Sequence, residues 1–426
     1  MRENFFIHHI NHACVEVITP YSSIITDPWI SGYCFADKLR LESQSSKPKL
    51  DKYDYVFLSH SHSDHWHESI KAISKEIQYS TFLIPCFDKE NYMLRNVRSK
   101  FKNKIIQFKG EYGFLKLNKY QKIHYAIDKK EHDCSIMIKS LNQPDVYLQT
   151  DNLMPIKREK LLGKDKDNIS NNISIGMYIK KKTGIYPRFI YSEDTENSSL
   201  ELEILKDKSS IAEQSNHIKE INTTFNFLYA SSIEYNDLKL DYKYPALEDS
   251  ILLNEYKKLG INSKIVKPGD IIFNDGSLKN EFEKFIIPEK INSNEDVLIK
   301  LNQNVFLENL KEFILNTIYI LNKKTFNKDL SDFEFTISIY KNDKKLITKI
   351  IKGVSYLKDS DHLTELRFNY SSLESIINNK WNFPTIRELT NGGLLIFRKD
   401  KKKQTKFERL LLNEIFMPNI LRLNKK

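Results

Sequence analysis

The segment Tyr55-Val-Phe-Leu-Ser-His-Ser-His-Ser-Asp-His65 joins an apolar run to a loop that carries three histidines and an aspartate. The apolar residues predict a short buried strand, and the polar groups crowd its end. Histidines two positions apart in an extended segment can converge on one ion, and the adjacent Asp64 and His65 present two more ligands. Neutral imidazole and carboxylate suit divalent zinc or iron, and three protein ligands per metal leave a position open for water. The segment therefore predicts a metal site.

Short apolar runs on both sides of this segment predict further strands. They are four to six residues long, rich in Ile, Val, Phe and Tyr, and bounded by polar residues, glycine or proline. They cover residues 5–10, 14–18, 23–26, 81–84, 105–108, 135–138 and 146–149. Ile70, Ile73 and Ile77 then recur at helical spacing, so we expect a helix between residues 66 and 79. This mixture predicts an α+β layered fold.

Length and composition indicate a folded chain of two domains. Its 426 residues exceed the size that one hydrophobic core usually supports. Hydrophobic residues make up 40% and charged residues 29%, values typical of globular proteins. The net charge of +10 comes from lysines spread along the chain, which are expected mainly on solvated faces but would also attract an anionic substrate. Because no stripe of arginine and aromatic residues is present, we propose no nucleic-acid partner.

The four cysteines are isolated, at Cys14, Cys34, Cys86 and Cys134. None belongs to a Cys-x-x-Cys pair, and none is followed two residues later by histidine. This pattern excludes a cysteine-based zinc site and a Rieske cluster carried by this chain. Because no signal peptide is recognised, we expect reduced thiols and a cytoplasmic location. No run approaches about 18 apolar residues, so we expect no membrane span.

Two later strand ends offer the remaining metal ligands. His132 precedes the strand predicted at residues 135–138, and Asp151 follows the strand predicted at 146–149. A hairpin of these strands would deliver one imidazole and one carboxylate to the same edge of a sheet, and a carboxylate can bridge two metals. The alternative role for each residue is a polar cap at a strand end. We expect both to be ligands.

The motif His60-x-His-x-Asp-His65, with His12-Ala-Cys and Thr26-Asp-Pro-Trp29 upstream, resembles the metallo-β-lactamase superfamily. The resemblance is strongest to lactonase-like hydrolases and to the metallo-β-lactamase-like part of CMP-N-acetylneuraminic acid hydroxylase. For the hydroxylase it extends to Asp133-Cys134, Thr150-Asp151 and Pro268-Gly-Asp270, in the same order, and covers roughly residues 5–275. It implies an αββα sandwich with a dinuclear metal centre.

The resemblance also implies how two divalent ions, zinc or iron, are held. It assigns the predicted ligands to two positions: His60, His62 and His132 to one, Asp64 and His65 to the second, and Asp151 as the bridge. Relatives with two complete positions usually add a late histidine. Here only His217 and His362 follow, and His217 lies in a polar helical stretch without a leading strand. We therefore do not expect His217 to be a ligand, and the second position is expected to be incompletely coordinated.

Asp27 and His12, which lie upstream of the motif, each have two possible roles. Asp27 would fix the histidine loop and orient a ligating imidazole, or would be a turn carboxylate before Pro28. His12 would touch substrate or metal, or would be a buried structural histidine. We expect His8 and His9 on a strand face, and His67 outside the set of metal ligands.

The catalytic domain is expected to span residues 1–275. Asn274-Asp-Gly would begin a linker that runs to about residue 296, and residues 297–426 would form a smaller α+β accessory domain. In that domain the sequence predicts helices at residues 305–321 and 371–378. It also predicts a hairpin of strands at 333–340 and 346–351 and a further strand at 394–398.

Three functions are compatible with this sequence. The leading one is a metal-dependent hydrolase in which Asp64 orients or deprotonates a metal-activated water that attacks an ester, amide, lactone or phosphodiester. The second is a non-haem di-iron oxygenase, which would take electrons from a separate ferredoxin or Rieske partner. The third is a metal-dependent binding or sensor protein. The ligand in each case is expected to be a small molecule.

Overall fold

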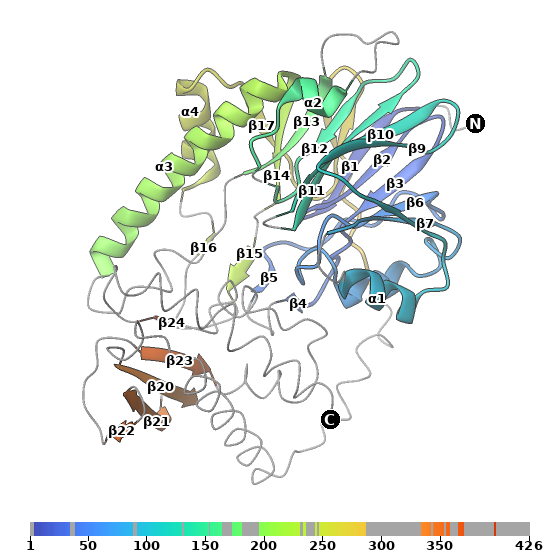
Figure 1. The fold of residues 1–426 in the computed structure, drawn as a ribbon. Helices are drawn as coiled ribbons and strands as arrows, with labels where there is room; N and C mark the ends of the chain where they lie inside the picture. The colour runs from blue at the N-terminus through green and yellow to red at the C-terminus, as the bar shows by residue number, and fades with distance from the viewer. Residues whose placement is uncertain are drawn as a thin grey trace.

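The computed structural model describes residues 4–286 except 35–38, 88–91, 130–131, 153, 164–172, 181–195, 231–232, 236–242 and 245–246, together with five strands between residues 334 and 397. Two large sheets make up most of the N-terminal part (Figure 1). The four cysteines are free thiols. Among the helices that the structure describes, none combines the length and apolar character needed to cross a membrane.

The first sheet has eight strands in the order β19-β18-β1-β2-β3-β6-β7-β8. In chain order their bounds are Phe6–Asn11 (β1), Cys14–Ile18 (β2), Ser23–Thr26 (β3), Tyr55–Phe57 (β6), Thr81–Pro85 (β7), Ile105–Phe108 (β8), Asp270–Phe273 (β18) and Leu278–Asn280 (β19). Neighbours from β19 to β3 are antiparallel, whereas β3, β6, β7 and β8 are parallel. The carboxyl ends of β3 and β6 therefore lie at the same edge.

The second sheet has seven strands in the order β17-β14-β13-β12-β11-β10-β9. Their bounds are Tyr112–Lys116 (β9), Gln121–Asp128 (β10), Asp133–Ser140 (β11), Val146–Leu148 (β12), Ile173–Ile179 (β13), Thr223–Tyr229 (β14) and Ser263–Ile265 (β17). The hairpin predicted around residues 135–149 is confirmed, because β11 and β12 pair antiparallel. From β12 to β17 the neighbours are parallel.

The two sheets pack face to face around one apolar core. Val15 and Val17 of β2 belong to the same core cluster as Ile136 of β11 and Met177 of β13, and all four are fully buried. The intervening residues of β2 point to the opposite face of the first sheet, as the two-residue period of a strand requires. There Glu16 lies fully buried and pairs with His8 on the neighbouring strand, which is the strand-face position expected for that histidine.

Helices cover the outer face of each sheet. The 3-10 helix η1 (Glu68–Ile73) and helix α1 (Tyr92–Lys100) pack on the first sheet. Helices α2 (Arg158–Leu162), α3 (Glu196–Ile221) and α4 (Asp249–Lys258) pack on the second, as Figure 1 shows for α3 and α4. The order helix, sheet, sheet, helix confirms the predicted α+β layered fold.

The helix expected between residues 66 and 79 is shorter than the spacing of isoleucines predicted. It is a 3-10 helix that starts after His67, whose side chain accepts a hydrogen bond from the Ser69 backbone N–H, and it ends at Ile73. Ile70, Ile73 and Ile77 are nevertheless all buried against the first sheet. The spacing of the isoleucines thus correctly predicted which side chains are buried, although the backbone continues in turns beyond Ile73.

Two smaller sheets complete the described strands. One has the order β16-β15-β5-β4, with bounds Tyr33–Cys34 (β4), Leu39–Leu41 (β5), Ile233–Tyr235 (β15) and Lys243–Tyr244 (β16). The other, in the C-terminal part, has the order β22-β21-β20-β23-β24, with bounds Glu334–Lys341 (β20), Lys344–Lys352 (β21), Ser355–Leu357 (β22), Glu365–Asn369 (β23) and Ile396–Phe397 (β24). Strands β20 and β21 pair antiparallel, which confirms the predicted hairpin. The helices predicted at residues 305–321 and 371–378 lie outside the described residues.

Asn274-Asp-Gly, expected to begin a linker, instead turns the chain between β18 and β19, which pair antiparallel. Gly276 has a φ of 73°, in the left-handed region that tight hairpins require. The first sheet thus continues to Asn280, just past the boundary placed at residue 275. The division into two domains stays a prediction.

The packing between the sheets predicts a large cost for shortening Ile136. Because this side chain is fully buried between both sheets, Ile136→Ala should lower the free energy of unfolding by about 2–5 kcal/mol. The matched control is Leu141→Ala, since Leu141 is 52% exposed in the turn just after the same strand, and its change should stay within about 0.5 kcal/mol. Urea unfolding followed by circular dichroism measures both. Equal changes in the two variants would contradict this account of the core.

Candidate metal centre

The histidine loop, residues 59–67, follows β6 after Leu58 and is held by Asp27, the residue after β3. The Asp27 carboxylate accepts hydrogen bonds from the Ser59 backbone N–H at 2.7 Å, from the Ser59 hydroxyl at 2.6 Å and from Nδ1 of His65 at 2.9 Å. The Ser59 hydroxyl is also 2.9 Å from Nδ1 of His60. Asp27 therefore orients His65 directly and His60 through Ser59. The expected contact between Asp27 and a predicted ligand is observed.

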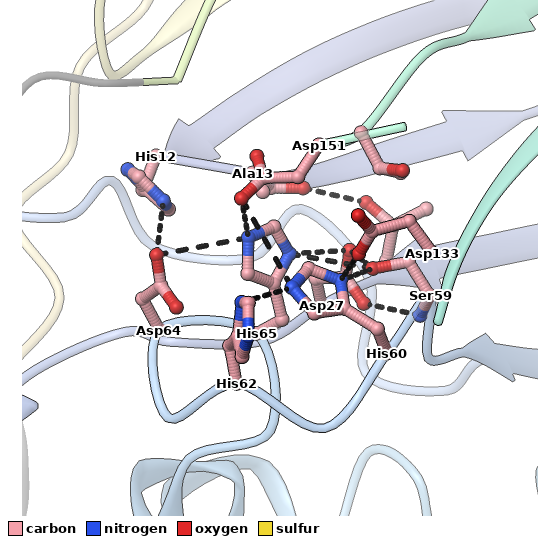
Figure 2. Close-up of polar contacts among 12 residues, drawn as sticks. His12, Ala13, Asp27, Ser59, His60, His62, Asp64, His65, Asp133 and Asp151 are labelled. Carbon is pink, nitrogen blue, oxygen red and sulfur yellow. Dashed lines mark hydrogen bonds and ion pairs between the residues drawn. The ribbon is translucent and has the colours of Figure 1, made fainter. Parts of the chain in front are cut away.

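Two groups of potential metal ligands lie side by side at this edge (Figure 2). The inner group is His12, Asp64 and His65, and all three residues are buried. Nε2 of His12 is 3.3 Å from Oδ2 of Asp64, and Nε2 of His65 is 3.7 Å from the same oxygen. His12 comes from the turn between β1 and β2, so the inner group joins the histidine loop to the start of the first sheet.

The outer group is His60, His62 and Asp151, of which the last two are half-buried. Nε2 of His60 lies 2.8 Å from Nδ1 of His62 and 4.0 Å from Oδ2 of Asp151. The same Asp151 oxygen is 3.4 Å from Nε2 of His65 in the inner group. In each group one candidate ligand atom from every residue lies within 4.8 Å of the others. Asp151 thus stands at the border of the two groups, where a bridging carboxylate would be.

Non-glycine residues with a left-handed backbone gather around this edge. His12, Asp27, His132, Thr150 and Ala230 have φ between 36° and 61°. Such conformations cost about 1–3 kcal/mol each and persist where the surrounding structure imposes them. At Thr150, for example, the hydroxyl donates to the Cys134 carbonyl at 2.7 Å and the backbone N–H donates to the Tyr229 hydroxyl at 3.3 Å. These bonds fix the direction in which the next residue, Asp151, leaves the strand.

His132 lies in neither group, although the sequence predicted it as a ligand beside His60 and His62. Its ring stacks on Phe87, with centroids 5.2 Å apart. The next residue, Asp133, instead approaches the outer group, with Oδ1 at 3.3 Å from Nδ1 of His60. His132 precedes β11 in a left-handed turn conformation with a φ of 61°, which directs its side chain away from that of Asp133, the first residue of the strand. Ligation by His132 stays a prediction.

The charges of the two groups are strongly coupled. Burial alone would raise the pKa of the Asp64 carboxyl, but His65 and His12 outweigh it and lower this pKa to about 2. Burial would also raise the pKa of the Asp151 carboxyl, but His65 outweighs it and lowers this pKa to about 2. Burial and the neighbouring imidazoles of His65 and His62 lower the pKa of His60 well below its usual value. The ionised carboxylates and the neutral His60 imidazole are protonation states that bind a cation. His65 differs, because Asp151, Asp64 and Asp27 outweigh burial and raise its pKa well above the usual value, so a cation at Nε2 of His65 displaces a proton.

The donor atoms fit divalent metal ions. Nε2 of His12, Oδ1 of Asp64 and Nε2 of His65 are buried and have no hydrogen-bond partner among the described residues. Buried polar atoms are normally hydrogen-bonded, so such a cluster calls for a ligand. Each group offers two imidazoles and one carboxylate, a set that suits zinc in hydrolases and ferrous iron in oxygenases.

The other histidines named from the sequence have separate partners. His67 caps η1, and its Nε2 is 2.9 Å from the Tyr33 carbonyl oxygen, so it lies outside both groups as expected. His9 bonds through Nε2 to the His12 carbonyl at 3.0 Å, which supports the turn that presents His12. His217 on α3 hydrogen-bonds the Tyr147 hydroxyl at 2.9 Å and belongs to neither group. His362 lies outside the described residues.

Comparisons with known proteins give similarities over parts of the chain. No family model matches it. Over 72 residues it is 33% identical to cytidine monophosphate-N-acetylneuraminic acid hydroxylase of Danio rerio, which is 16% of this chain and only 12% of the hydroxylase. This match bears out the predicted similarity to the hydroxylase over that stretch.

Solved structures with similar folds include both hydrolases and a hydroxylase. Igni18, a metallo hydrolase from Ignicoccus hospitalis KIN4/I, is 13% identical with a TM-score of 0.39, over 66% of this chain and 100% of that one. CmlA, a diiron β-hydroxylase from Streptomyces venezuelae, is 13% identical with a TM-score of 0.41, over 66% and 55%. The metallo-β-lactamase fold protein YhfI from Bacillus subtilis is 14% identical with a TM-score of 0.37, over 63% and 99%. Each of these structures is similar to this chain over part of its length.

The hydrogen bonds of Asp27 predict an effect on metal binding without direct contact. Asp27→Asn loses the charge that orients His65 and, through Ser59, His60, so metal affinity should fall about 10–100-fold. The control is Asp54→Asn, because Asp54 accepts similar bonds from Ser23 at the opposite ends of β3 and β6. Chelator competition measures the affinity of each variant. If Asp54→Asn lowers metal affinity as much as Asp27→Asn, the loss results from a less stable fold and not from the orientation of the ligands.

His217→Gln should leave metal content unchanged and should make the protein less sensitive to acid. Burial lowers the pKa of His217 to about 4, below the value of about 6.5 expected when unfolded. The folded state therefore binds fewer protons, so stability present above pH 6.5 is lost as the pH falls toward 4, by at most about 1.4 kcal/mol per pH unit. Urea unfolding at pH 7 and pH 5 should show a smaller loss in the variant. A marked loss of metal would instead make His217 a ligand.

Proposed function

We propose that this protein is a metal-dependent hydrolase with a dinuclear centre of the metallo-β-lactamase type. The observation that supports it is the pair of adjacent groups, each with two imidazoles and a carboxylate, that meet at Asp151. Two such positions at the end of a sheet would hold two divalent ions next to each other. Hydrolysis needs no electron donor, so the groups of this chain suffice for the reaction.

The ligands divide between two positions. In our assignment the inner position is held by His12, Asp64 and His65, and the outer by His60 and His62, with Asp151 shared between them. His12 would then occupy the place for which the sequence offered no late histidine. His132 remains a candidate third imidazole of the outer position. To reach it, its ring would have to turn away from Phe87.

Bound at these positions, two divalent ions would lower the pKa of a water between them and so supply a nucleophile at neutral pH. The residues of the chain supply geometry and a proton acceptor. Asp27 and Ser59 hold the rings of His65 and His60 in one orientation. Asp64, which lies between His62 and His65 in the loop, would orient the attacking water or accept its proton. The substrate would be a small ester, amide, lactone or phosphodiester, and the net charge of +10 favours an anionic one.

A non-haem di-iron oxygenase is the alternative. It is favoured by the 72-residue match to the hydroxylase, and a set of two histidines and one carboxylate also suits ferrous iron. This chemistry would require electrons from a separate ferredoxin or Rieske protein, because the four cysteines of this chain are isolated free thiols.

Metal analysis of protein purified without added metal separates these functions. Our proposal predicts a colourless protein that contains zinc and hydrolyses some members of a panel of chromogenic esters, lactones and phosphodiesters. A coloured protein that contains iron and bleaches on reduction would overturn it in favour of the oxygenase. Bound zinc without hydrolysis of any substrate in the panel would favour a binding or sensor protein.

Asp64→Asn tests the catalytic role on the same samples. The substitution keeps the size of the side chain but removes the charge, so at saturating metal it should retain much of the metal and lose about a hundredfold or more in rate. The control is His67→Gln, since His67 is the last residue of the histidine loop but lies outside both groups. Near wild-type rates in Asp64→Asn with the metal in place would contradict the mechanism. Joint loss of metal and activity would make Asp64 a ligand first.

A further inference from the structure

We infer that the two metal positions fill in a fixed order, the inner position first and the outer second, and that the outer ion exchanges with the solution. This inference rests on the proposed dinuclear centre and adds a regulatory property to it. Three independent features of the two groups lead to it: their charge, the hydrogen bonding of their donor atoms and the rigidity of their side chains.

Charge favours the inner position. Carboxylate oxygens of Asp64 and Asp151 lie 3.7 and 3.4 Å from Nε2 of His65, so a cation beside this nitrogen faces two negative charges. A cation in the outer group faces mainly Asp151, whose oxygen is 4.0 Å from Nε2 of His60, because Asp133 approaches the other nitrogen of that ring. At these distances, and away from bulk water, one additional charge outweighs small differences in geometry.

Hydrogen bonding acts in the same direction. In the inner group Nε2 of His12 and Nε2 of His65 make only long contacts, at 3.3 Å to Asp64 and 3.4 Å to Asp151, and Oδ1 of Asp64 has no hydrogen-bond partner among the described residues, so an incoming ion replaces looser contacts at these atoms. In the outer group Nε2 of His60 and Nδ1 of His62 lie 2.8 Å apart and satisfy each other. An ion between them must first break this contact, which reduces its net binding free energy.

The inner ligands are also the more rigid ones. His65 is fully buried and fixed by Asp27, and His12 is 4% exposed and packs edge-on against Trp29 with centroids 5.3 Å apart. In the outer group the side chain of Asp151 is 27% exposed and His62 is half-buried. Ligands held before the ion arrives lose less conformational entropy when it binds. The solvent-exposed side of the outer group is, by contrast, the route by which an ion leaves.

The shared carboxylate couples the two steps. Once an ion fills the inner position, Asp151 is partly neutralised and the second ion meets a positive charge beside it. The second step is therefore weaker than the first. At limiting metal the protein carries only the inner ion, so an activity that requires both ions rises and falls with the free metal concentration.

Titration of chelator-treated full-length protein with Co²⁺ tests this order, with the visible absorption bands reporting ligation and a competing chelator giving affinities. Wild-type protein should bind a first equivalent at least about tenfold more tightly than a second. His62→Ala should keep the first step at wild-type affinity and lose the second. His12→Ala should weaken the first step about 10–100-fold, and Asp64→Asn, which preserves size, should weaken the same step. His217→Gln is the control and should titrate like wild type.

The outcomes separate this inference from the proposed function. A tight first step that survives in His12→Ala and Asp64→Asn but is lost in His62→Ala would overturn the order. Two equal steps in wild-type protein would overturn it as well. Absence of any bound Co²⁺ in wild-type protein would overturn the dinuclear centre itself. Ordered binding in a protein that hydrolyses nothing would uphold the order and reject the hydrolase. Circular dichroism of each variant verifies that the fold is intact.

Discussion

The geometry of the metal centre depends on the hydrogen bonds that the Asp27 carboxylate accepts. The carboxylate accepts three hydrogen bonds from the histidine loop, and they orient one imidazole of the inner group directly and one of the outer group through Ser59. Asp27 can do this because β3 and β6 are parallel neighbours whose carboxyl ends meet at one edge. The parallel pairing of these strands thus places Asp27 where it can orient the imidazoles of the histidine loop.

Six strands of the first sheet and the β11–β12 hairpin could be predicted from the sequence because these strands are short, apolar and rich in β-branched and aromatic residues. β2, β3 and β8 have the predicted bounds. Seven strands of the two large sheets were not predicted: β9, β10, β13, β14, β17, β18 and β19. In β10, Gln121, Lys122 and His124 interrupt the apolar pattern, and the polar groups of Gln121 and His124 find partners only in the folded protein. The isoleucine period after the histidine loop predicted which side chains are buried but not the type of helix, which also depends on local hydrogen bonds.

For the candidate site, local sequence identified the residues of the histidine loop, and strand ends identified Asp151. His12 had two open readings, because its proximity to Asp64 depends on the pairing of β1 with its neighbours and on a left-handed turn. The approach of Asp133 to His60 was not foreseen either, since a shift of one residue at a strand end decides which side chain faces the loop. A signal was present in the adjacent His132 and Asp133, of which the sequence alone cannot choose one.

The pairing of β1 with β18 has a consequence for biosynthesis. Phe6 lies opposite Phe273, so one edge of β1 has no partner until the chain has been synthesised almost to the end of the first sheet. At about 5–20 residues per second, the ribosome needs roughly 13 to 53 s to make the intervening residues. During that interval the strand that leads into His12 exposes unpaired backbone amides and carbonyls, which can pair with another nascent chain. Slower translation before β18 would therefore lower the yield of folded protein, even though every candidate metal ligand has already been made.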